Sequence, residues 1–201
     1  MYKKFMKRPF DLILSLAAFL VFSPILLILA IIVKTTSSGP VFFRQERAGK
    51  NGKYFRIFKF RSMAVDPGAE KKGFEPGSKM RVTSIGRILR KTKLDELPQL
   101  INVIKGEMSI VGPRPEVRRY VDLYPERWAI VLSIAPGITD PGSIEFRNEE
   151  DILASSADPE KEYIEKLLPE KLDIYEKYVQ TISFASDIKI IARTAAAVIF
   201  K

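Results

Sequence analysis

The sequence contains neither cysteine nor histidine among its 201 residues. Without cysteine, the chain can form no disulfide, no thiolate zinc site and no cysteine nucleophile. Without histidine, it lacks an imidazole general base, a Ser–His–Asp triad and any histidine-bound metal. Catalysis by this chain would therefore have to use carboxylates, lysine and arginine cations, and a cation bound through oxygen, for which Mg²⁺ is the natural candidate.

Negative charge is scarce in the first half of the chain. The whole sequence carries 33 Lys and Arg against 24 Asp and Glu, a net charge of +9, but residues 1–94 carry +15 and residues 95–201 carry −6. The basic half is expected to face an anionic partner. Charge alone does not choose between lipid headgroups, a nucleotide diphosphate and nucleic acid.

One long uncharged run lies near the N-terminus. Residues 12–33 read LILSLAAFLVFSPILLILAIIV, which is long enough to span the hydrocarbon core of a bilayer. Pro24 removes one helical hydrogen bond in the middle of this run, so a bend or break is expected at Ser23 and Pro24. The run is too long for a secretory signal and no cleavage pattern follows it, so we expect it to stay in the protein.

Both flanks of the run are basic, with four cations in residues 1–8 and five in residues 34–53. Positive flanks favour the cytoplasmic side, and both can lie there only if the helix enters the membrane, turns and leaves by the same face. We therefore predict a re-entrant helical hairpin over residues 1–36 and a cytoplasmic-face domain, holding any catalytic site, over residues 37–201. A single membrane-spanning anchor with a proline kink is the alternative.

The remaining sequence predicts an α+β fold that is mostly helical. Residues 41–63 are typical of two short strands around a turn at residues 49–52, because Asn-Gly supplies the positive φ angles that a hairpin needs. Residues 64–80 are rich in proline, glycine and charge, and they are predicted to form a loop. The sequence shows no internal repeat and no second domain.

Two helices are predicted after this loop. Apolar residues recur at helical spacing from Thr83 onward, and a second helix is expected from Asp95 through Ile104, before Gly106 stops it. Asp95 would be the N-cap of this second helix. Pro98 would fall in its first turn, where a missing amide hydrogen costs nothing.

Three later segments are also predicted to be helical. Residues 115–134 are amphipathic and carry aromatic side chains beside arginines: Tyr120, Tyr124, Trp128, Arg118, Arg119 and Arg127. This composition suits a membrane interface, and the alternative is an ordinary surface helix with one buried face. Residues 145–176 are strongly acidic and are predicted to be a solvated helical region. Residues 187–200 are apolar over much of the helix circumference and are expected to lie on the bilayer.

The adjacent carboxylates Asp95 and Glu96 are the candidates for chemistry. They follow a group of cations dense enough to bind a diphosphate: Arg87, Arg90, Lys91 and Lys93. Further along the chain, a proline on each side of Arg114 fixes the position of its guanidinium. An aspartate can attack phosphorus to form an acyl phosphate, a divalent cation can bridge carboxylate and phosphate oxygens, and arginines can neutralise the developing charge.

Each of these features also has a plain structural interpretation. An aspartate at a helix start is commonly a cap that contributes about 1 kcal/mol, and a glutamate in the first turn complements the helix dipole. A rival class of function is a membrane-anchored basic adaptor that binds acidic lipid or nucleic acid without catalysis. That class leaves the paired carboxylates beside an arginine turn unexplained, and the sequence shows no recognised nucleic-acid fold, so we expect no nucleic-acid partner.

In the order of its motifs, the chain resembles the bacterial sugar transferases, also called monotopic phosphoglycosyl transferases. The resemblance covers nearly the whole chain and includes the basic start and the apolar Ser-Pro helix. It also rests on five motifs: GPVFFRQERAG (39–49), FKFRSM (58–63), LDELPQL (94–100), NVIKGEMS (102–109) and VGPRP (111–115). Together and in this order, the motifs are highly specific. A polytopic sugar-phosphate transferase would need several spans, and only one adequate run is visible.

The resemblance implies a two-step exchange on the cytoplasmic face of the bacterial inner membrane, with Mg²⁺ as cofactor. The carboxylate of Asp95 would attack the sugar-linked phosphate of a UDP-sugar, release UMP and form a covalent phosphosugar intermediate, which undecaprenyl phosphate then takes. Glu96 would help to hold Mg²⁺, and Arg114 would bind phosphate. Lys59 and Arg90 would contribute to the same anionic pocket, and the lipid bilayer would be a further partner.

The chain departs from the resemblance after Pro136-Gly-Ile-Thr139. Many members continue with glycine and a stretch containing Ala-Gln, whereas this chain has DPGSIEFR at residues 140–147. The altered segment is expected to bear on sugar or nucleotide recognition, with Arg147 as a candidate ligand. The large N-terminal extension of longer members is absent, which predicts a minimal catalytic form. The sequence leaves open which sugar is transferred, which glycan pathway is served and whether the chain forms a homodimer.

Overall fold

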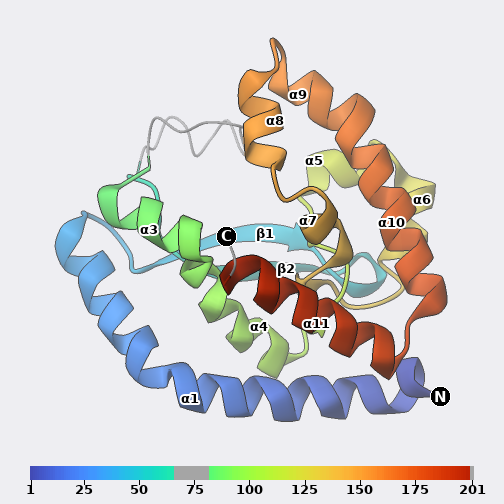
Figure 1. The fold of residues 1–201 in the computed structure, drawn as a ribbon, viewed down its shortest axis with the longest axis horizontal. Helices are drawn as coiled ribbons and strands as arrows, with labels where there is room; N and C mark the ends of the chain where they lie inside the picture. The colour runs from blue at the N-terminus through green and yellow to red at the C-terminus, as the bar shows by residue number, and fades with distance from the viewer. Residues whose placement is uncertain (66–81, 200–201) are drawn as a thin grey trace.

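The computed structural model describes residues 1–65 and 82–199, and over these residues the fold is α+β and mostly helical, as predicted. Its helices pack around two small two-stranded sheets, and one long helix, α1, borders the molecule (Figure 1). The loop predicted for residues 64–80 lies outside the described residues from residue 66 onward.

The apolar run forms one helix, α1 (Lys7–Thr36), which follows a short π-helical turn, η1 (Tyr2–Met6). Within the described ranges it is the one helix that is long and apolar enough to cross a membrane, judged by length and composition. Pro24 lies inside α1. Figure 1 shows that α1 bends between a first half along the lower edge and a second half that rises on the left. The expected bend is present, and the helix continues through it.

Both halves of α1 pack against the rest of the protein. The buried residues of the first half are polar and share one face, at four-residue spacing: Lys7, Asp11 and Ser15. Asp11 accepts hydrogen bonds from Ser109 Oγ at 2.7 Å and from the Ile110 amide at 3.0 Å. The second half joins an apolar cluster whose buried members are Leu29, Val33, Phe60 and Leu89. The polar first half and the apolar second half are therefore both attached to the same folded unit.

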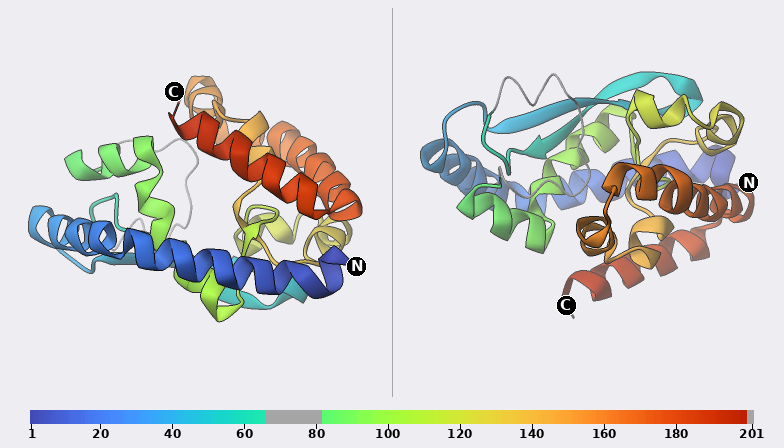
Figure 2. Two further views of the ribbon diagram at one scale, coloured as in Figure 1. Left: turned by 60° about the horizontal axis from the view of Figure 1, so that its bottom comes forward. Right: turned by 90° about the horizontal axis from the view of Figure 1, so that it is seen from above.

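The start of α1 is held by a buried carboxylate near the start of α11 (Phe184–Ile199). Asp187 is fully buried and accepts hydrogen bonds from Lys7 Nζ at 2.6 Å, Tyr2 Oη at 2.8 Å and Tyr178 Oη at 2.6 Å. Such a charge is tolerated in the interior because it is paired and its oxygens are bonded. Accordingly, α11 lies beside the N-terminal end of α1 (Figure 2).

The predicted β-hairpin is confirmed. Strands β1 (Phe42–Ala48) and β2 (Tyr54–Phe60) pair antiparallel over all seven residues of each strand. The turn between them contains Asn51 and Gly52 at φ values of +56° and +73°, the left-handed values that Asn-Gly was expected to supply. The hairpin brings β2 beside the segment that carries the two candidate carboxylates.

The first helix predicted after the loop is also confirmed. Helix α3 (Ser84–Thr92) begins at Thr83, whose side chain accepts a hydrogen bond from the Gly86 amide at 2.9 Å. A Cβ at Gly86 would lie 1.9 Å from the carbonyl oxygen of Ser62, so the backbone segment after β2 can pack this closely on α3 only at a glycine.

The helix around Asp95 begins differently from the prediction. The chain turns at Lys93, at φ +58°, and enters a 3₁₀ helix, η3 (Leu94–Gln99), which continues into α4 (Leu100–Lys105). Asp95 therefore lies inside the first turn and caps nothing, so its assignment as an N-cap is wrong. The predicted stop is confirmed, because α4 ends at Gly106 with φ +85°.

A second, parallel sheet leads into the arginine turn. Strand β3 (Ser109–Val111) pairs with β4 (Gly137–Thr139). A Cβ at Gly137 would lie 2.1 Å from the Gly112 amide nitrogen, so these two backbone segments approach too closely for any side chain at residue 137. This contact holds the segment that follows β3, which carries Arg114, against β4.

Residues 115–134 form two short helices, α5 (Arg118–Val121) and α6 (Pro125–Val131). Tyr120 is fully buried and Trp128 is 1% exposed, and both belong to the main apolar core. The prediction that these two aromatics lie at a membrane interface is wrong. The alternative, a surface segment with one buried face, is what the structure shows.

Ion pairs explain why α6 faces protein at this position. Arg127 of α6 contacts Asp173 Oδ1 at 2.5 Å and Glu176 Oε1 at 2.6 Å, both on α10 (Leu168–Thr181). A composition of aromatics and arginines is common to a lipid interface and to a protein interface. Here the acidic residues of α10 bind Arg127, so α6 packs against protein.

The acidic region of residues 145–176 is helical, as predicted, but it is buried on one side. After α7 (Pro141–Glu145), which ends where the region begins, it contains two short helices and a π-helical turn before α10: α8 (Glu149–Ser155), α9 (Pro159–Glu162) and η4 (Tyr163–Leu167). The main core includes the buried residues Leu153, Tyr163, Leu167, Leu168, Leu172 and Tyr175. The region therefore supplies much of the core on which α5 and α6 rest.

Candidate active site

Asp95 is buried and incompletely bonded. It is 7% exposed, and its Oδ1 atom has no hydrogen-bond partner in the part of the chain that the structure describes. Buried carboxylate oxygens are normally bonded, and an unsatisfied one costs free energy. The oxygen is therefore available to a ligand or a reacting atom, and the helix-cap interpretation does not account for this residue.

Glu96 lies between two cations from different parts of the chain. Its Oε1 atom is 2.6 Å from Lys59 Nζ and 3.0 Å from Arg114 Nη2. The structure thus brings four of the predicted site residues together: Asp95 and Glu96 from η3, Lys59 from β2 and Arg114 from the turn after β3. We call these four residues the carboxylate–cation cluster.

Lys59 is positioned by a fully buried asparagine on α4. Asn102 accepts a hydrogen bond from the Phe58 amide at 2.9 Å through Oδ1 and donates to the Arg56 carbonyl at 2.9 Å through Nδ2. A second Nδ2 contact, at 2.7 Å, reaches Glu107. Asn102 therefore ties β2 to α4 on both sides of Ile57, two residues before Lys59.

Arg114 is positioned by a turn that is bonded along its length. Arg47 of β1 donates to the Pro115 carbonyl at 3.2 Å and contacts Glu116 Oε1 at 3.2 Å. Glu116 is buried and also accepts a hydrogen bond from Tyr163 Oη at 2.6 Å. These contacts hold the backbone on the C-terminal side of Arg114, and the glycine contact with β4 holds the other side.

Burial and neighbouring charges shift the pKa values of the two carboxylates in opposite directions. Burial raises the pKa of Asp95 to about 6, partly opposed by Lys59 and reinforced by the charge of Glu96. Burial acts in the same direction on Glu96, but Lys59 and Arg114 outweigh it and hold its pKa well below the usual range. Glu96 is therefore a fixed anion, whereas Asp95 is the more basic carboxylate and the better nucleophile of the two.

Burial and Glu96 also shift the pKa values of the two cations, Lys59 and Arg114. Glu96 raises the pKa of Arg114, and burial lowers the pKa of Lys59, which Glu96 partly offsets. Lys59 and Arg114 share Glu96 as a counter-ion, and Asp95 adds a second carboxylate to the cluster. An incoming phosphate would therefore meet an ordered group of charges whose net value is small.

The donor set fits Mg²⁺ only together with a substrate. The described residues contain no group of three or more carboxylates that could hold a metal ion by themselves. Mg²⁺ is usually bound by one or two carboxylates and completes its shell with water and substrate phosphates. Glu96 Oε2 has no hydrogen bond or ion pair among the described residues, and Asp95 Oδ1 is unpartnered, so two oxygens are available.

Comparison with known proteins identifies the family of this site. A sequence model described as "Bacterial sugar transferase" matches residues 2–201. The chain belongs to the bacterial sugar transferase family. The resemblance found from the motifs is thereby confirmed over the whole chain.

Several relatives in this family carry names that state a reaction. The chain is 37% identical to UDP-N-acetylgalactosamine-undecaprenyl-phosphate N-acetylgalactosaminephosphotransferase of Aeromonas hydrophila, over 94% of this chain and 43% of that protein. It is 38% identical to UDP-glucose:undecaprenyl-phosphate glucose-1-phosphate transferase of Escherichia coli K12, over 95% and 39%. The chain therefore spans less than half the length of these two relatives. It is also 37% identical to the uncharacterized sugar transferase EpsL of Bacillus subtilis, over 96% and 87%.

Two further residues predicted to bind phosphate, Arg90 and Arg147, are not part of the carboxylate–cation cluster. Arg90 is half-buried on α3, and its charge opposes a small part of the rise that burial causes in the pKa of Asp95. Arg147 is exposed, and its Nη2 donates to the Ala197 carbonyl of α11 at 2.9 Å. Within the described ranges no hydrogen bond or ion pair joins Arg147 to the carboxylate–cation cluster, and its role stays a prediction.

The altered segment of residues 140–147 begins with a structural aspartate. Asp140 is 1% exposed, caps α7 by accepting from the Ser143 amide at 2.7 Å, and accepts from Tyr175 Oη at 3.0 Å. Its charge also helps to raise the pKa of Arg114, after the larger effect of Glu96. The departure therefore alters the electrostatic surroundings of Arg114 as well as the loop.

Sequence reasoning missed three residues around the site: Arg47, Asn102 and Gln99, the last of which lines a small pocket with Lys59 and Arg114. Arg47 and Asn102 act on segments more than 40 residues away, at Pro115 and at β2, so only a motif could indicate them. All three lie inside motifs that carried the family resemblance. That membership was the available signal, and a role for each residue needed the fold.

Proposed function

We propose that this protein transfers a sugar 1-phosphate from a UDP-sugar to undecaprenyl phosphate and releases UMP. The observation that carries the proposal is the unpartnered, buried Oδ1 of Asp95 beside the Lys59–Glu96–Arg114 ion pairs. The names of relatives support the substrate class, since they describe UDP-sugar and undecaprenyl-phosphate transferases. The product would be the first lipid-linked sugar in the assembly of a polysaccharide or another glycoconjugate.

The reaction would proceed in two displacements at one phosphorus. In the first, a carboxylate oxygen of Asp95 forms a bond to the sugar-bearing phosphorus, and the bond from that phosphorus to the bridging oxygen breaks. The electron pair of that bond leaves with UMP. In the second, an oxygen of undecaprenyl phosphate bonds to the same phosphorus and the bond to Asp95 breaks, which restores the carboxylate.

The other cluster residues would stabilise charge in both displacements. Lys59 and Arg114 are positioned to neutralise phosphate oxygens, and Arg114 can contact two of them through its fork of donors. Glu96 would help to hold Mg²⁺, together with phosphate oxygens. When bound, Mg²⁺ would neutralise charge on the diphosphate and on the departing UMP.

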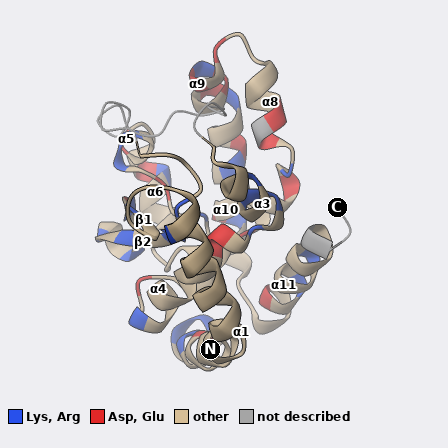
Figure 3. Cartoon of the chain, turned by 90° about the vertical axis from the view of Figure 1, so that its left-hand side faces the viewer, with Lys and Arg blue, Asp and Glu red and all other residues tan. Residues whose placement is uncertain are grey.

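We also propose that α1 is re-entrant and places the site at the cytoplasmic face of the bacterial inner membrane. The contacts of both halves of α1 with one folded unit support this topology, because a single span would separate its two ends by a bilayer. Residues 20–25, on either side of Pro24, are all exposed, and all but Ser23 and Pro24 are large and apolar. Figure 3 shows α1 without charge over most of its length.

Cysteine labelling tests this topology, and the chain contains no cysteine of its own to interfere. We expect single cysteines at Lys4 and Thr36, both exposed positions, to react with an impermeant maleimide from the same side of sealed vesicles. Reaction from opposite sides would show a single span and overturn the hairpin.

The transfer itself is tested by incubating the purified chain with Mg²⁺, undecaprenyl phosphate and a panel of UDP-sugars. We expect UMP release with at least one sugar and its loss in Asp95→Asn, with the fold retained. Trapping the phosphosugar adduct and mapping it to the peptide that contains Asp95 would establish residue and mechanism together. Full activity of Asp95→Asn would overturn the nucleophile assignment.

A further inference from the structure

A second polar atom near Asp95 is buried without a partner. Gln99, the last residue of η3, lies four residues after Asp95 and is 2% exposed. Its Nε2 atom forms no hydrogen bond in the described part of the chain. Leaving a buried amide donor unpaired is unfavourable. Such a donor is expected to find its partner in a ligand.

Gln99 lines a small pocket beside the carboxylate–cation cluster. The lining residues are Arg47, Ile57, Lys59, Gln99, Arg114 and Pro115. The pocket has a free volume of about 10 Å³. That volume is roughly what a single water molecule, or one oxygen atom of a larger ligand, needs. We call this space the Gln99 pocket.

The chemistry of the Gln99 pocket favours an anionic oxygen over water. Three of its six lining side chains are cations, and none is a carboxylate. The lining side chains offer one acceptor, Oε1 of Gln99 itself, so a water molecule would find few acceptors for its two protons. A phosphate oxygen carries no proton to place and accepts from every donor around it.

We propose that the Gln99 pocket receives a non-bridging oxygen of the phosphoryl group that Asp95 attacks, and that Gln99 is a catalytic residue that donates a hydrogen bond to that oxygen. This inference rests on the proposed function. During the first displacement the bond from Asp95 to phosphorus forms while the bond from phosphorus to the UMP oxygen breaks, and no proton moves at Gln99. The second displacement reverses the roles of the two bonds around the same oxygen.

A neutral donor adds what the cations alone do not supply. Lys59 and Arg114 both already contact the Glu96 carboxylate, at 2.6 Å and 3.0 Å. The Gln99 amide has no such competitor, so its dipole remains fully available when charge builds on the phosphoryl oxygens. Its place one turn after the nucleophile, on the same short helix, fixes the two groups relative to each other.

The test is the steady-state kinetics of Gln99→Met, which keeps the length of the side chain and removes the donor. With a UDP-sugar that the unmodified protein turns over, we expect kcat to fall on the order of 100-fold and KM to stay within about threefold, as for loss of one oxyanion donor. Gln180→Met, an exposed glutamine on α10, is the matched control and should change neither constant. Thermal unfolding of each variant verifies that the chain is folded.

The outcomes separate this inference from the proposed function. If no UDP-sugar gives UMP with the unmodified chain, the proposed function fails and the inference fails with it. If the unmodified chain is active and Gln99→Met keeps kcat within about threefold, only the inference is overturned. A rise in KM at unchanged kcat also overturns it, since the donor would then serve binding alone. Should Gln99→Met unfold, Gln99→Glu keeps the shape, removes the donor at pH 8, and must lose activity by at least as much.

Discussion

Asp95 combines two properties that oppose folding, burial and an unbonded carboxylate oxygen. Burial raises its pKa from 3.8 to about 6, although Lys59 acts in the opposite direction. The ionised form is therefore less stable in the folded chain than in the unfolded one. Polar groups held at such a cost are concentrated at functional sites, where they remain ready for a ligand.

The Asp95→Asn variant should be more stable than the unmodified chain while losing activity. A carboxyl whose pKa is higher in the folded state destabilises the fold above that pKa, so the benefit of its removal is largest near neutral pH. We expect the free energy of unfolding to rise by roughly 1–3 kcal/mol at pH 7.5. As the pH falls from 6 through 3.8, the folded chain's carboxyl protonates first and the difference should disappear. Thermal unfolding in one detergent, with EDTA to remove metal ions, measures both effects.

An exposed aspartate provides the control for this prediction. Asp122, whose side chain is 64% exposed, contacts Arg118 at 3.7 Å on the surface of the molecule. Its replacement in Asp122→Asn should change stability by less than about 0.5 kcal/mol at either pH. Equal stability of Asp95→Asn and the unmodified chain at pH 7.5 would show that the buried carboxylate carries no such cost.

At the level of secondary structure, the site depends on short elements that are joined by side chains. The η3 helix has six residues and β3 has three, too few to be stable alone. Asn102 bonds α4 to β2, and Asp11 of α1 bonds β3 through Ser109 and Ile110. The positions of Lys59 and Arg114 thus depend on contacts between elements, and α1 is part of that support.

Asn102→Ala should lower both stability and activity. The change leaves the Phe58 amide and the Arg56 carbonyl without their partner, which should cost about 2–4 kcal/mol. For a chain of this length that corresponds to a fall in Tm of about 4–16 °C. Asn148→Ala, an exposed asparagine outside the site, is the control and should leave Tm unchanged. An equal Tm for Asn102→Ala and the unmodified chain would show that the hydrogen bonds from Asn102 to β2 do not stabilise the fold.

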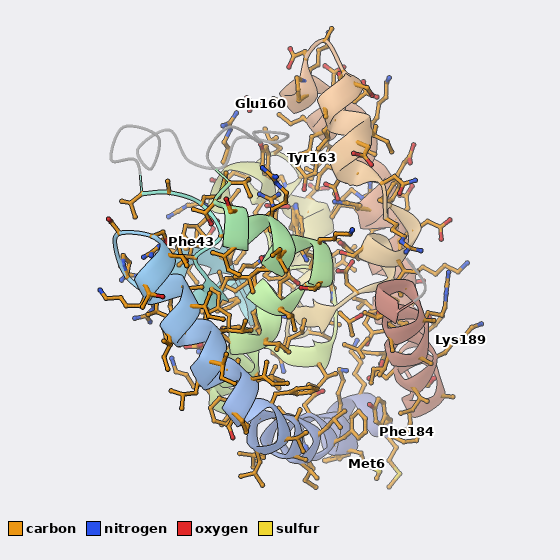
Figure 4. All side chains as sticks on the ribbon, turned by 60° about the vertical axis from the view of Figure 1, so that its left-hand side comes forward. Met6, Phe43, Glu160, Tyr163, Phe184 and Lys189 are labelled. Carbon is orange, nitrogen blue, oxygen red and sulfur yellow. The ribbon has the colours of Figure 1, made fainter. Side chains whose placement is uncertain are left out.

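At the level of the whole molecule, apolar groups gather where α1 and α11 begin. Phe184 meets Tyr2 and Phe10 edge-to-face, at ring-centroid distances of 5.8 Å and 5.3 Å. Met6 and Phe184 lie at the same end of the molecule, and Lys189 points outward from α11 (Figure 4). Phe184 and Met6 are more than half exposed. We therefore predict that this end of the molecule contacts a lipid surface, with α11 along it.

Ile188→Asp tests whether α11 lies on the bilayer. Ile188 is 42% exposed on α11, and a charge there should weaken contact with lipid by about 1.5–3 kcal/mol. We expect turnover of undecaprenyl phosphate in bilayer nanodiscs to fall several-fold, with activity in detergent micelles retained. Ile152→Asp, 39% exposed on α8, is the matched control and should behave like the unmodified chain. An equal effect of both variants would assign the loss to stability.

Local chemistry made much of the fold predictable. The Asn-Gly turn specifies its hairpin through the φ angles of two residues, and Thr83 and Gly106 mark a helix start and a helix end through backbone bonding. The carboxylate pair and the two cations of the cluster were found through motifs. Their distances required the fold, because Lys59, Glu96 and Arg114 come from three separate segments.

What could not be predicted depended on partners distant in sequence. The aromatics of residues 120–128 would suit a membrane as well as a core, and the ion pairs of Arg127 with α10 decide for the core. Asp95 looked like a cap because a left-handed residue at Lys93 is rare and cannot be read from lysine itself. The unpartnered amide of Gln99 has no local signature at all.

The ion pairs of Glu96 have a consequence for which anions the site accepts. Glu96 is tethered to the chain, so it competes for Lys59 and Arg114 at every moment, whatever the surrounding solution contains. An inorganic phosphate that arrives alone must displace a partner that cannot diffuse away. A diphosphate that arrives with a divalent cation would give Glu96 a replacement partner and would free both side chains at once. We therefore expect the resting ion pairs to disfavour small anions that arrive alone and to favour a substrate that arrives with a metal ion.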